Sequence, residues 1–380
     1  MRPTLAALAA ALLTACSGGA GHPSPVATPV RGAPTPMACA PAQTPASAPG
    51  LASPLPLVTL ASGLDQPDDL LWDGGLLLVG EYRAGRIAVL GDRGGPRLLP
   101  GQVPEVEGLA RLGGDLYAAD QLHDRVVRVA ADGTVTPVVQ LQPVPGVEGV
   151  DGIASDGSRL LVPDSARGRL LFVGPDGRVE RAVGSFLRPT GAWPMPDGSV
   201  LVADENAGRV QRLTPDGGRT VLASGIGLVD DVAAAPGGAV YAIGISRGVL
   251  VQISDGAARD LVTGFREPQG LTLDGAGNPI VGDLQQGRVV AVVASFLLLP
   301  AGPPPRLRPG QPLCVDLVRA PGFTDPIDLR VSAPDRVLSQ PGSGSRGEVL
   351  PGGACGGVCW VQVGAVSGGR SGTVWLPYSR

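Results

Sequence analysis

The stretch Arg188-Pro-Thr-Gly-Ala-Trp-Pro-Met-Pro-Asp-Gly-Ser-Val-Leu-Val-Ala-Asp204 carries the pattern that decides the fold. It holds an apolar run, an Asp-Gly turn and a second apolar run that ends in an acid, and Gly208-Arg209 then opens a third apolar run. Glu148–Asp164 shows the same order 40 residues earlier. Because Asp-Gly turns between short apolar runs are typical of β-hairpins, we expect each unit to form an antiparallel sheet.

The same pattern occurs six times between residues 55 and 300. The first apolar residue of the third run marks each copy, and the spacings are 39, 44, 40, 40 and 39: Ile87, Val126, Leu170, Val210, Leu250 and Val289. Units of about 40 residues with hairpin turns are typical of β-propellers, in which each unit forms one four-stranded blade. Residues 55–300 are therefore expected to form a six-bladed propeller.

The last copy lacks a fourth strand, because the prolines at 303–305 follow soon after Val289 and Val293. A segment that matches the missing fourth strand precedes the first copy: Leu57-Val-Thr-Leu-Ala-Ser-Gly-Leu64. We expect this N-terminal strand to complete the last blade, which closes the ring and removes two exposed sheet edges.

Two copies resemble a known family most clearly, namely Pro189–Val210 and Pro268–Val289. They follow the pattern Pro-x-Gly-(apolar), Asp-Gly, an apolar strand ending in Asp, and Gly-Arg-Val. This pattern resembles the NHL-repeat propellers and the wider SMP-30/gluconolactonase-like group. The resemblance implies the propeller fold, which hosts binding modules as well as lactonases and esterases.

Residues 301–380 are expected to form a small β-sandwich, because short alternating strands with Pro and Gly turns follow the prolines. The strands are expected at Leu313–Arg319, Ile327–Val331 and Cys359–Val363. The stretch Ala320–Pro334 resembles the Ig-like accessory domains of bacterial surface proteins. The predicted fold class is thus all-β, a six-bladed propeller followed by an Ig-like sandwich.

The N-terminus has the features of an export signal. Arg2 precedes a short apolar run, and Leu13-Thr14-Ala15-Cys16 resembles a bacterial lipobox. Residues 1–15 are therefore expected to be a lipoprotein signal peptide, with Cys16 as the lipidated residue; an ordinary secretory signal is the alternative. Residues 16–54 are rich in Pro, Ala, Gly, Ser and Thr and are expected to be a semi-rigid spacer. The protein is then extracytoplasmic and tethered to the envelope membrane.

Four cysteines remain after Cys16, which predicts two disulfides in an exported protein: Cys39, Cys314, Cys355 and Cys359. Cys314 can pair with Cys359 and Cys39 with Cys355. Alternatively, Cys355 and Cys359 close a small loop and Cys39 pairs with Cys314. Zinc binding is a further alternative.

Acids recur at the end of the second strand of five copies, and an arginine follows each after five residues. The fifth copy has Gly244 and Val249 at these positions, so acid and arginine are absent together. This joint absence indicates that each pair acts as a structural ion pair. The acids are Glu81, Asp120, Asp164, Asp204 and Asp283.

A second set of polar residues lies where each first strand begins, and no arginine accompanies it: Asp68, Glu107, Asp151, Thr190, Asp230 and Gln269. In a propeller these positions converge at the mouth of the central channel. Their oxygen atoms suit Ca²⁺ or Mg²⁺ better than zinc, so a metal site at Asp68, Glu107, Asp151, Thr190 and Asp230 is one prediction. A water-filled acidic mouth without a specific ion is the other.

The gluconolactonase resemblance implies roles for some of these residues. Asp230 matches the metal-binding Asp of the family, Asp68 stands where the family has Glu, and Asp151 matches a substrate-side segment. Thr190 replaces the Asn of the family, which departs from its metal site. Other catalytic candidates are few; His123 follows Asp120 in a turn and could reach the same face.

The composition limits the classes of function that the chain can have. Hydrophobic residues make up 43% of the chain, so a large core can be buried, and the net charge of −4 with no basic cluster excludes nucleic-acid binding. We expect a lipid-anchored binding or scaffold protein that takes a protein or small-molecule ligand on the channel face. The alternative is a divalent-metal-dependent lactonase or related hydrolase.

Overall fold

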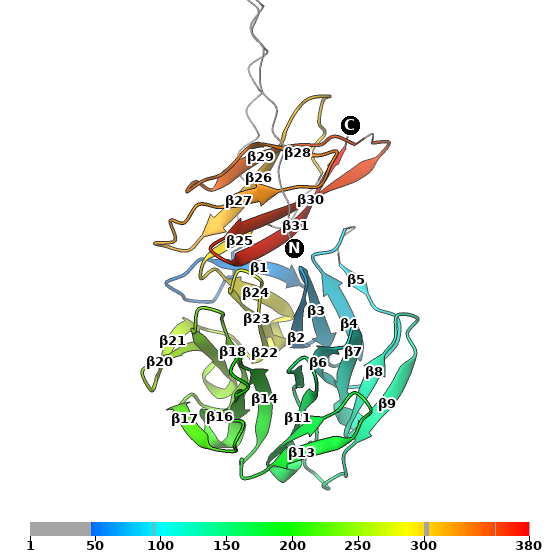
Figure 1. Ribbon diagram of the computed structural model, residues 1–380, viewed down its shortest axis with the longest axis vertical. Coiled ribbons are helices and arrows are strands. Elements are labelled where there is room, and N and C mark those ends of the chain that lie inside the picture. Colours follow the sequence, from blue (N-terminus) through cyan, green and yellow to red (C-terminus); the bar gives the residue numbers. More distant parts are fainter. Residues whose placement is uncertain (1–46, 94–95, 300–303, 354, 380) are drawn as a thin grey trace, which may run out of the picture. The chain divides into compact units, whose positions relative to one another are not determined.

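The computed structural model describes residues 47–93, 96–299, 304–353 and 355–379. Within these residues the chain forms seven four-stranded sheets and one three-stranded sheet, and the named strands pair antiparallel (Figure 1). The described helices are short 3₁₀ turns, and none of them is long and apolar enough to cross a membrane. The predicted signal peptide, most of the spacer, Cys16 and Cys39 lie outside the described residues.

Six of the four-stranded sheets correspond to the six sequence repeats, and we number them in chain order. Sheet 1 contains β2 (Pro67–Asp73), β3 (Leu76–Glu81), β4 (Arg86–Leu90) and β5 (Arg97–Leu98). Sheet 2 contains β6 (Val106–Leu112), β7 (Asp115–Asp120), β8 (Arg125–Val129) and β9 (Val135–Gln140). Sheet 3 contains β10 (Ala154–Ser155), β11 (Leu160–Asp164), β12 (Arg169–Val173) and β13 (Val179–Val183).

The remaining repeats follow the same order. Sheet 4 contains β14 (Pro189–Pro194), β15 (Val200–Asp204), β16 (Arg209–Leu213) and β17 (Arg219–Ser224). Sheet 5 contains β18 (Val229–Ala234), β19 (Val240–Gly244), β20 (Val249–Ser254) and β21 (Ala257–Thr263). Sheet 6 contains β22 (Pro268–Leu273), β23 (Pro279–Asp283) and β24 (Arg288–Val292), with β1 (Leu57–Ser62) as its fourth strand.

The N-terminal strand closes the last sheet, as predicted. β1 pairs with β24 in the register Leu57↔Val292 and Val58↔Ala291, and Val58 is fully buried. This pairing joins chain segments more than 200 residues apart and leaves neither strand with an open edge on that side. The six residues that mark the repeats are all buried on the third strands, which confirms the alignment of the repeats.

The first strands of the sheets gather at the centre of the ring, where each contacts the first strand of its neighbours (Figure 1). Their close approach requires glycine at the third position of several strands. A Cβ at Gly270 would lie 2.0 Å from the carbonyl oxygen of Asp68, and one at Gly108 would lie 2.6 Å from the nitrogen of Ile153. The repeated Gly of the sequence pattern is thus a packing requirement of the hub.

The C-terminal strands form two further sheets. One contains β25 (Phe296–Leu298), β26 (Leu313–Arg319), β29 (Arg346–Leu350) and β28 (Arg336–Ser339), and the other contains β27 (Asp328–Arg330), β30 (Val358–Ser367) and β31 (Arg370–Ser379). β25 pairs with β26, so this part of the fold begins at Phe296, inside the range predicted for the propeller. The fully buried Phe296 explains the difference, because it packs with Val315 and Val363 of the C-terminal core.

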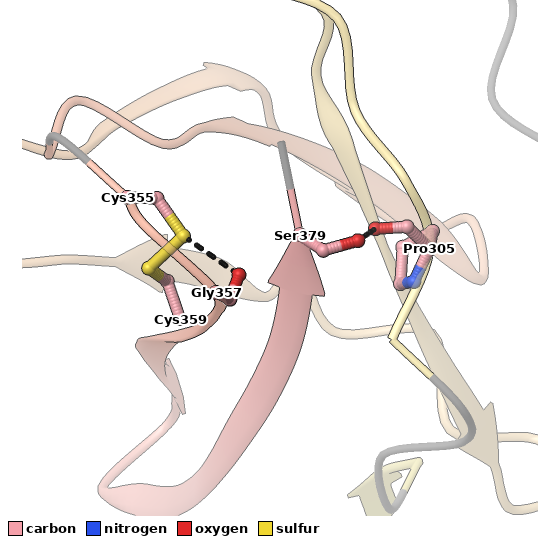
Figure 2. Close-up of a disulfide and its surroundings, with 5 residues drawn as sticks. All are labelled: Pro305, Cys355, Gly357, Cys359 and Ser379. Carbon is pink, nitrogen blue, oxygen red and sulfur yellow. Dashed lines mark hydrogen bonds between the residues drawn. A yellow bond between two sulfur atoms is a disulfide. The ribbon is translucent and has the colours of Figure 1, made fainter.

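Cys355 and Cys359 form a disulfide that closes a short loop around Gly357 (Figure 2). This bond confirms that half of the second predicted pairing and rules out Cys314 with Cys359. Cys314 is disulfide-bonded as well. Close to this loop, Figure 2 also shows the end of β31, where the Ser379 hydroxyl donates to the carbonyl oxygen of Pro305 at 3.5 Å.

Candidate functional site

The five acids predicted to pair with arginine do so, and the turn between acid and arginine explains the spacing. In sheets 2 to 6 a 3₁₀ turn connects the second and third strands: η1 (Gln121–His123), η2 (Ser165–Arg167), η3 (Glu205–Ala207), η4 (Ile245–Arg247) and η5 (Leu284–Gln286). A residue in the left-handed region ends each turn, for example Gly168 with φ 58°. The acid and the arginine then face each other as a cross-strand pair.

The ion-pair distances are short on all five sheets. The separations are 2.9 Å for Glu81–Arg86, 2.7 Å for Asp120–Arg125, 2.6 Å for Asp164–Arg169, 3.1 Å for Asp204–Arg209 and 2.9 Å for Asp283–Arg288. The acids are buried to at least 97%. Each pair joins the second and third strands of its sheet, which confirms the predicted ion pairs.

Asp204 shows how such an acid ties the chain together. Its Oδ1 accepts hydrogen bonds from the backbone nitrogens of Leu187 and Arg188 at 2.8 and 3.0 Å, which fixes the loop that enters sheet 4. Its Oδ2 accepts from Gln211 Nε2 at 2.8 Å and pairs with Arg209. In sheet 5 the glycine at this position is necessary, because a Cβ on Gly244 would lie 2.4 Å from the carbonyl oxygen of Ile226.

A polar cavity of about 280 Å³ lies at the other set of acids, where the first strands begin. We call it the mouth cavity. Arg188 is the one cationic side chain among the described residues that line it. Seven carboxyl side chains line it as well: Asp68, Glu107, Glu148, Asp151, Glu205, Asp230 and Glu267.

Burial and mutual repulsion raise the pKa values of the acids in the mouth cavity. For Asp68, Glu107 and Asp230 burial is the larger cause, and the nearby Asp151 carboxylate raises each pKa further. Burial also raises the pKa of Asp151, to about 6, although Arg188 opposes the shift. These four residues come from four different sheets, so the fold brings them within electrostatic reach of one another.

Arg188 neutralises one side of the mouth cavity. Its Nη2 lies 2.8 Å from Glu148 Oε2 and 3.0 Å from Asp151 Oδ2, while Nη1 pairs with Glu205. Burial alone would lower the pKa of Arg188, but Asp151 and Glu205 outweigh it and the pKa is raised. The four acids outside these three ion pairs are Asp68, Glu107, Asp230 and Glu267.

The structure brings most of the predicted ring together. Asp68, Glu107, Asp151 and Asp230 line the mouth cavity. So does Gln269, whose amide nitrogen donates to Asp230 Oδ1 at 3.1 Å in the orientation that satisfies both side chains.

Two predicted residues lie elsewhere. The Thr190 hydroxyl is fully buried and donates to the backbone carbonyl oxygens of Val229 and Asp230 at 3.1 and 2.6 Å. It points to the neighbouring strand, so it is not among the cavity-lining groups. His123 is half exposed, and its Nδ1 lies 2.8 Å from Asp120 Oδ1, so it belongs to the ion-paired turn of sheet 2.

The mouth cavity does not fit a divalent metal in this arrangement. Across the described ranges, no group of three or more His, Cys, Asp or Glu side chains is placed to hold a metal ion. The engagement of Thr190 with backbone carbonyls removes the oxygen that the repeat alignment placed at the centre of the ring.

Sequence reasoning missed eight residues that line the mouth cavity, of which five are charged or aromatic: Tyr82, Glu148, Arg188, Glu205 and Glu267, with Gln66, Ile245 and Leu284 as the other three. A signal was present for four of them. Tyr82 and Glu205 follow the arginine-paired acid of their repeats, and Arg188 and Glu267 precede the proline that begins the first strand. Both positions recur in every copy, so an alignment of the repeats at these positions would have assigned them to the mouth.

No protein-family model matches the chain, and a search of curated proteins found no match. The chain is similar to the structure of a gluconolactonase from Xanthomonas campestris, with 15% identity and a TM-score of 0.54 over 63% of this chain and 89% of that one. A structural-genomics target provisionally assigned as a gluconolactonase gives 16% identity and a TM-score of 0.50 over 62% and 91% of the two chains.

A virginiamycin B lyase from Staphylococcus aureus gives 13% identity and a TM-score of 0.48 over 63% of this chain and 98% of that one. The two gluconolactonase-type matches support the fold, a β-propeller like those of the SMP-30/gluconolactonase-like group.

Proposed function

We propose that this chain is a binding protein of the cell envelope whose mouth cavity takes a hydrophilic organic cation, such as an alkyl diamine. The observation that carries the proposal is the charge imbalance of the cavity. Seven carboxyl side chains face one arginine, and three of the seven are already paired with it. A cationic ligand would supply the charge that Asp68, Glu107, Asp230 and Glu267 lack.

The raised pKa values support this assignment. Burial and neighbouring carboxylates raise the pKa values of Asp68, Glu107 and Asp230, because ionising every acid in one cavity is unfavourable. A bound cation reverses that penalty and releases the protons. Tyr82, Ile245 and Leu284 line the same cavity and offer less polar surface for the carbon chain of such a ligand.

The proposed setting is extracytoplasmic. Lipid attachment at Cys16 would hold the protein at the membrane, and residues 16–54 would act as the spacer. We further propose a six-bladed propeller with an Ig-like C-terminal domain that spaces or docks it. Cys16→Ser in the precursor tests the anchor: the protein should leave the membrane fraction and lose incorporation of labelled fatty acid. Retention of both in Cys16→Ser would contradict it.

A divalent-metal-dependent lactonase or related hydrolase is the second candidate. It is favoured by the fold similarity to the Xanthomonas gluconolactonase. The family resemblance adds Asp230 and Asp151, which match family positions, and Asp68, which stands where the family has Glu; all three line the mouth cavity. The position of Thr190 and the spread of the acids weigh against it, because a hard cation needs convergent oxygen ligands.

Thermal unfolding of the full mature chain separates the two candidates. The additives are 1,4-diaminobutane, Ca²⁺, Mg²⁺, Mn²⁺ and Zn²⁺ at matched ionic strength, with NaCl as the reference. A ligand at about 100 times its dissociation constant adds about 2.7 kcal/mol to the free energy of unfolding. A shift with the diamine that is lost in Glu107→Gln supports the binding protein, and a shift only with a divalent ion supports the hydrolase.

The control is Asp115→Asn, because Asp115 is exposed and its pair with Arg128 lies away from the mouth cavity. This variant should keep the full diamine shift. If no additive shifts the unfolding temperature, both candidates fail. If Asp115→Asn loses the shift as Glu107→Gln does, the effect is a general response to charge and the mouth cavity is not the site.

A further inference from the structure

The first strands line a second cavity farther along the channel, with a volume of about 320 Å³. We call it the tryptophan cavity, because Trp72 and Trp193 form part of its wall. Asp68 lines the mouth cavity, whereas its neighbour Asp69 lines the tryptophan cavity, so the two cavities follow each other along β2. Its volume falls at the small end of ligand sites, which span about 300–1,000 Å³.

The wall of the tryptophan cavity is mostly apolar. Leucine, isoleucine, alanine and proline side chains from five of the six first strands contribute to it. Trp72 and Trp193 each pack one part of the ring against the core and leave another part exposed. Both residues therefore serve the core and the cavity wall. Such a wall suits an apolar ligand body.

Two carboxyl groups lie at the end of the tryptophan cavity that follows the mouth acids. Asp69 accepts a hydrogen bond from the backbone nitrogen of Leu109, and Asp231 accepts from those of Val232 and Leu271 at 2.7 and 3.1 Å. These bonds fix both side chains and leave further acceptor positions on the carboxylate oxygens. Asp69 is 92% buried, so the pair is held in largely apolar surroundings.

The one guanidinium on the described wall is already neutralised. Arg111 Nε and Nη2 each lie 2.9 Å from Asp73 Oδ2, and Nη1 donates to the carbonyl oxygen of Gly114 at 3.2 Å. Arg111 is therefore committed at the outer end of the cavity. The net charge that a ligand meets inside comes from Asp69 and Asp231.

We propose that the tryptophan cavity is a second ligand site, which takes a small apolar amine. Its ammonium group meets Asp69 and Asp231, and its apolar body lies along Trp72 and Trp193. Ammonium groups are attracted by carboxylates and by the faces of indole rings alike. The wall of the tryptophan cavity is apolar, so its ligand differs from that of the mouth cavity. This proposal therefore does not depend on the proposed function.

The site is expected to respond to pH. Burial raises the pKa of Asp231 to about 7 and that of Asp69 well above its ordinary value. The charged groups around them are Asp68, Asp151 and Asp230 on the mouth side, with Arg111 held by Asp73 on the other. As the pH falls through 7, Asp231 takes up a proton and the affinity for an ammonium group should fall.

Tryptophan fluorescence of the full mature chain, titrated with 2-phenylethylamine, tests the proposal. Two of the four tryptophans line the cavity, so saturable binding should change the emission. We expect Asp231→Asn to weaken binding by about tenfold or more, which is the usual effect of removing one charged partner. The matched control Glu107→Gln changes the mouth cavity and should bind the amine as the wild type does.

The neutral analogue 2-phenylethanol supplies the second arm, and it should bind at least about tenfold more weakly than the amine. If Asp231→Asn fails to fold, the variant Trp193→Leu is used in its place. It should weaken binding of the amine, and the fluorescence of Trp72 still reports that binding. The proposal is overturned if the amine shows no saturable binding at millimolar concentration. It is also overturned if the alcohol binds as tightly as the amine, or if Glu107→Gln no longer binds the amine while Asp231→Asn still does.

Discussion

Two sets of acids in the same repeats have opposite surroundings. The arginine-paired acids, such as Asp204, are fully buried and surrounded by donors. The mouth acids, such as Asp68, Glu107 and Asp230, face one another across a cavity, and burial raises the pKa of each. A few residues of chain separate the two positions in each repeat, yet one set stabilises the fold and the other destabilises it in the absence of a ligand.

The difference teaches that an acid in a repeat is best judged by the partner that accompanies it. Each structural acid has an arginine five residues later, and both disappear together in sheet 5. The mouth acids have no such partner in sequence, and in space a single arginine serves three of the seven. Several acids without cationic partners in one cavity repel one another, and a bound cation can relieve this repulsion.

The largest expected effect comes from removing an arginine-paired acid. Asp204→Ala leaves Arg209 unpaired and two backbone nitrogens without their acceptor, so we expect the free energy of unfolding to fall by about 3–5 kcal/mol. Denaturant unfolding measures the change. The control Asp115→Ala removes an exposed pair and should cost less than about 1 kcal/mol. Equal costs for the two variants would contradict the structural role.

Removing Arg188 should have the next largest effect and should make the mouth more acidic. Arg188→Gln leaves Glu148, Asp151 and Glu205 without their cation, so we expect a loss of about 2 kcal/mol at pH 8. The loss should shrink at pH 5, where Asp151, whose pKa burial raises to about 6, takes up a proton. Unfolding at both pH values measures it, and a loss that is independent of pH would argue against this electrostatic role.

The wild type should lose stability as the pH rises from about 4 to about 7. Asp151 of the mouth cavity and Asp231 of the tryptophan cavity keep protons in the folded state that they lose when unfolded, since burial raises the pKa of Asp151 to about 6 and that of Asp231 to about 7. The unfolded state binds fewer protons in this range, so the free energy of unfolding falls with pH. Denaturant midpoints across this range test the sign, and a rise over the same range would contradict it.

The smallest effect has the opposite sign to the first. Asp68→Asn removes a buried acid whose pKa is raised by burial and by the neighbouring carboxylates, so we expect it to stabilise the ligand-free protein by about 1 kcal/mol at pH 7.5. It should also flatten the fall of stability with pH. A destabilisation as large as that of Asp204→Ala would show that the two sets of acids do not differ.

Most of the fold could be predicted from the sequence, because the signals repeat. The marker residues Ile87 to Val289 gave the register of six sheets, and the missing strand of the last repeat led to Leu57. The start of the C-terminal sheets at Phe296 could not be predicted. β25 has three residues and no turn signal, and its place depends on pairing with β26, beyond the prolines at 303–305.

The site was predictable only in part, for a physical reason. The backbone positions of Asp68, Glu107, Asp151 and Asp230 follow from the repeat, so their meeting could be predicted. The direction of a side chain depends on its neighbours in space. Thr190 occupies the same repeat position, but its hydroxyl finds two backbone carbonyls of sheet 5 and turns away from the mouth.

Calorimetric titration with 1,4-diaminobutane in two buffers of different ionisation enthalpy, at pH 6.5, measures the protons released when the mouth cavity is filled. If the unpaired carboxyls of the mouth receive the ligand, binding should release protons to the buffer, and Glu107→Gln should release fewer while Asp115→Asn releases as many as the wild type. Binding with no proton release, or with the same release in Glu107→Gln as in the wild type, would contradict the assignment of the mouth cavity as the cation site.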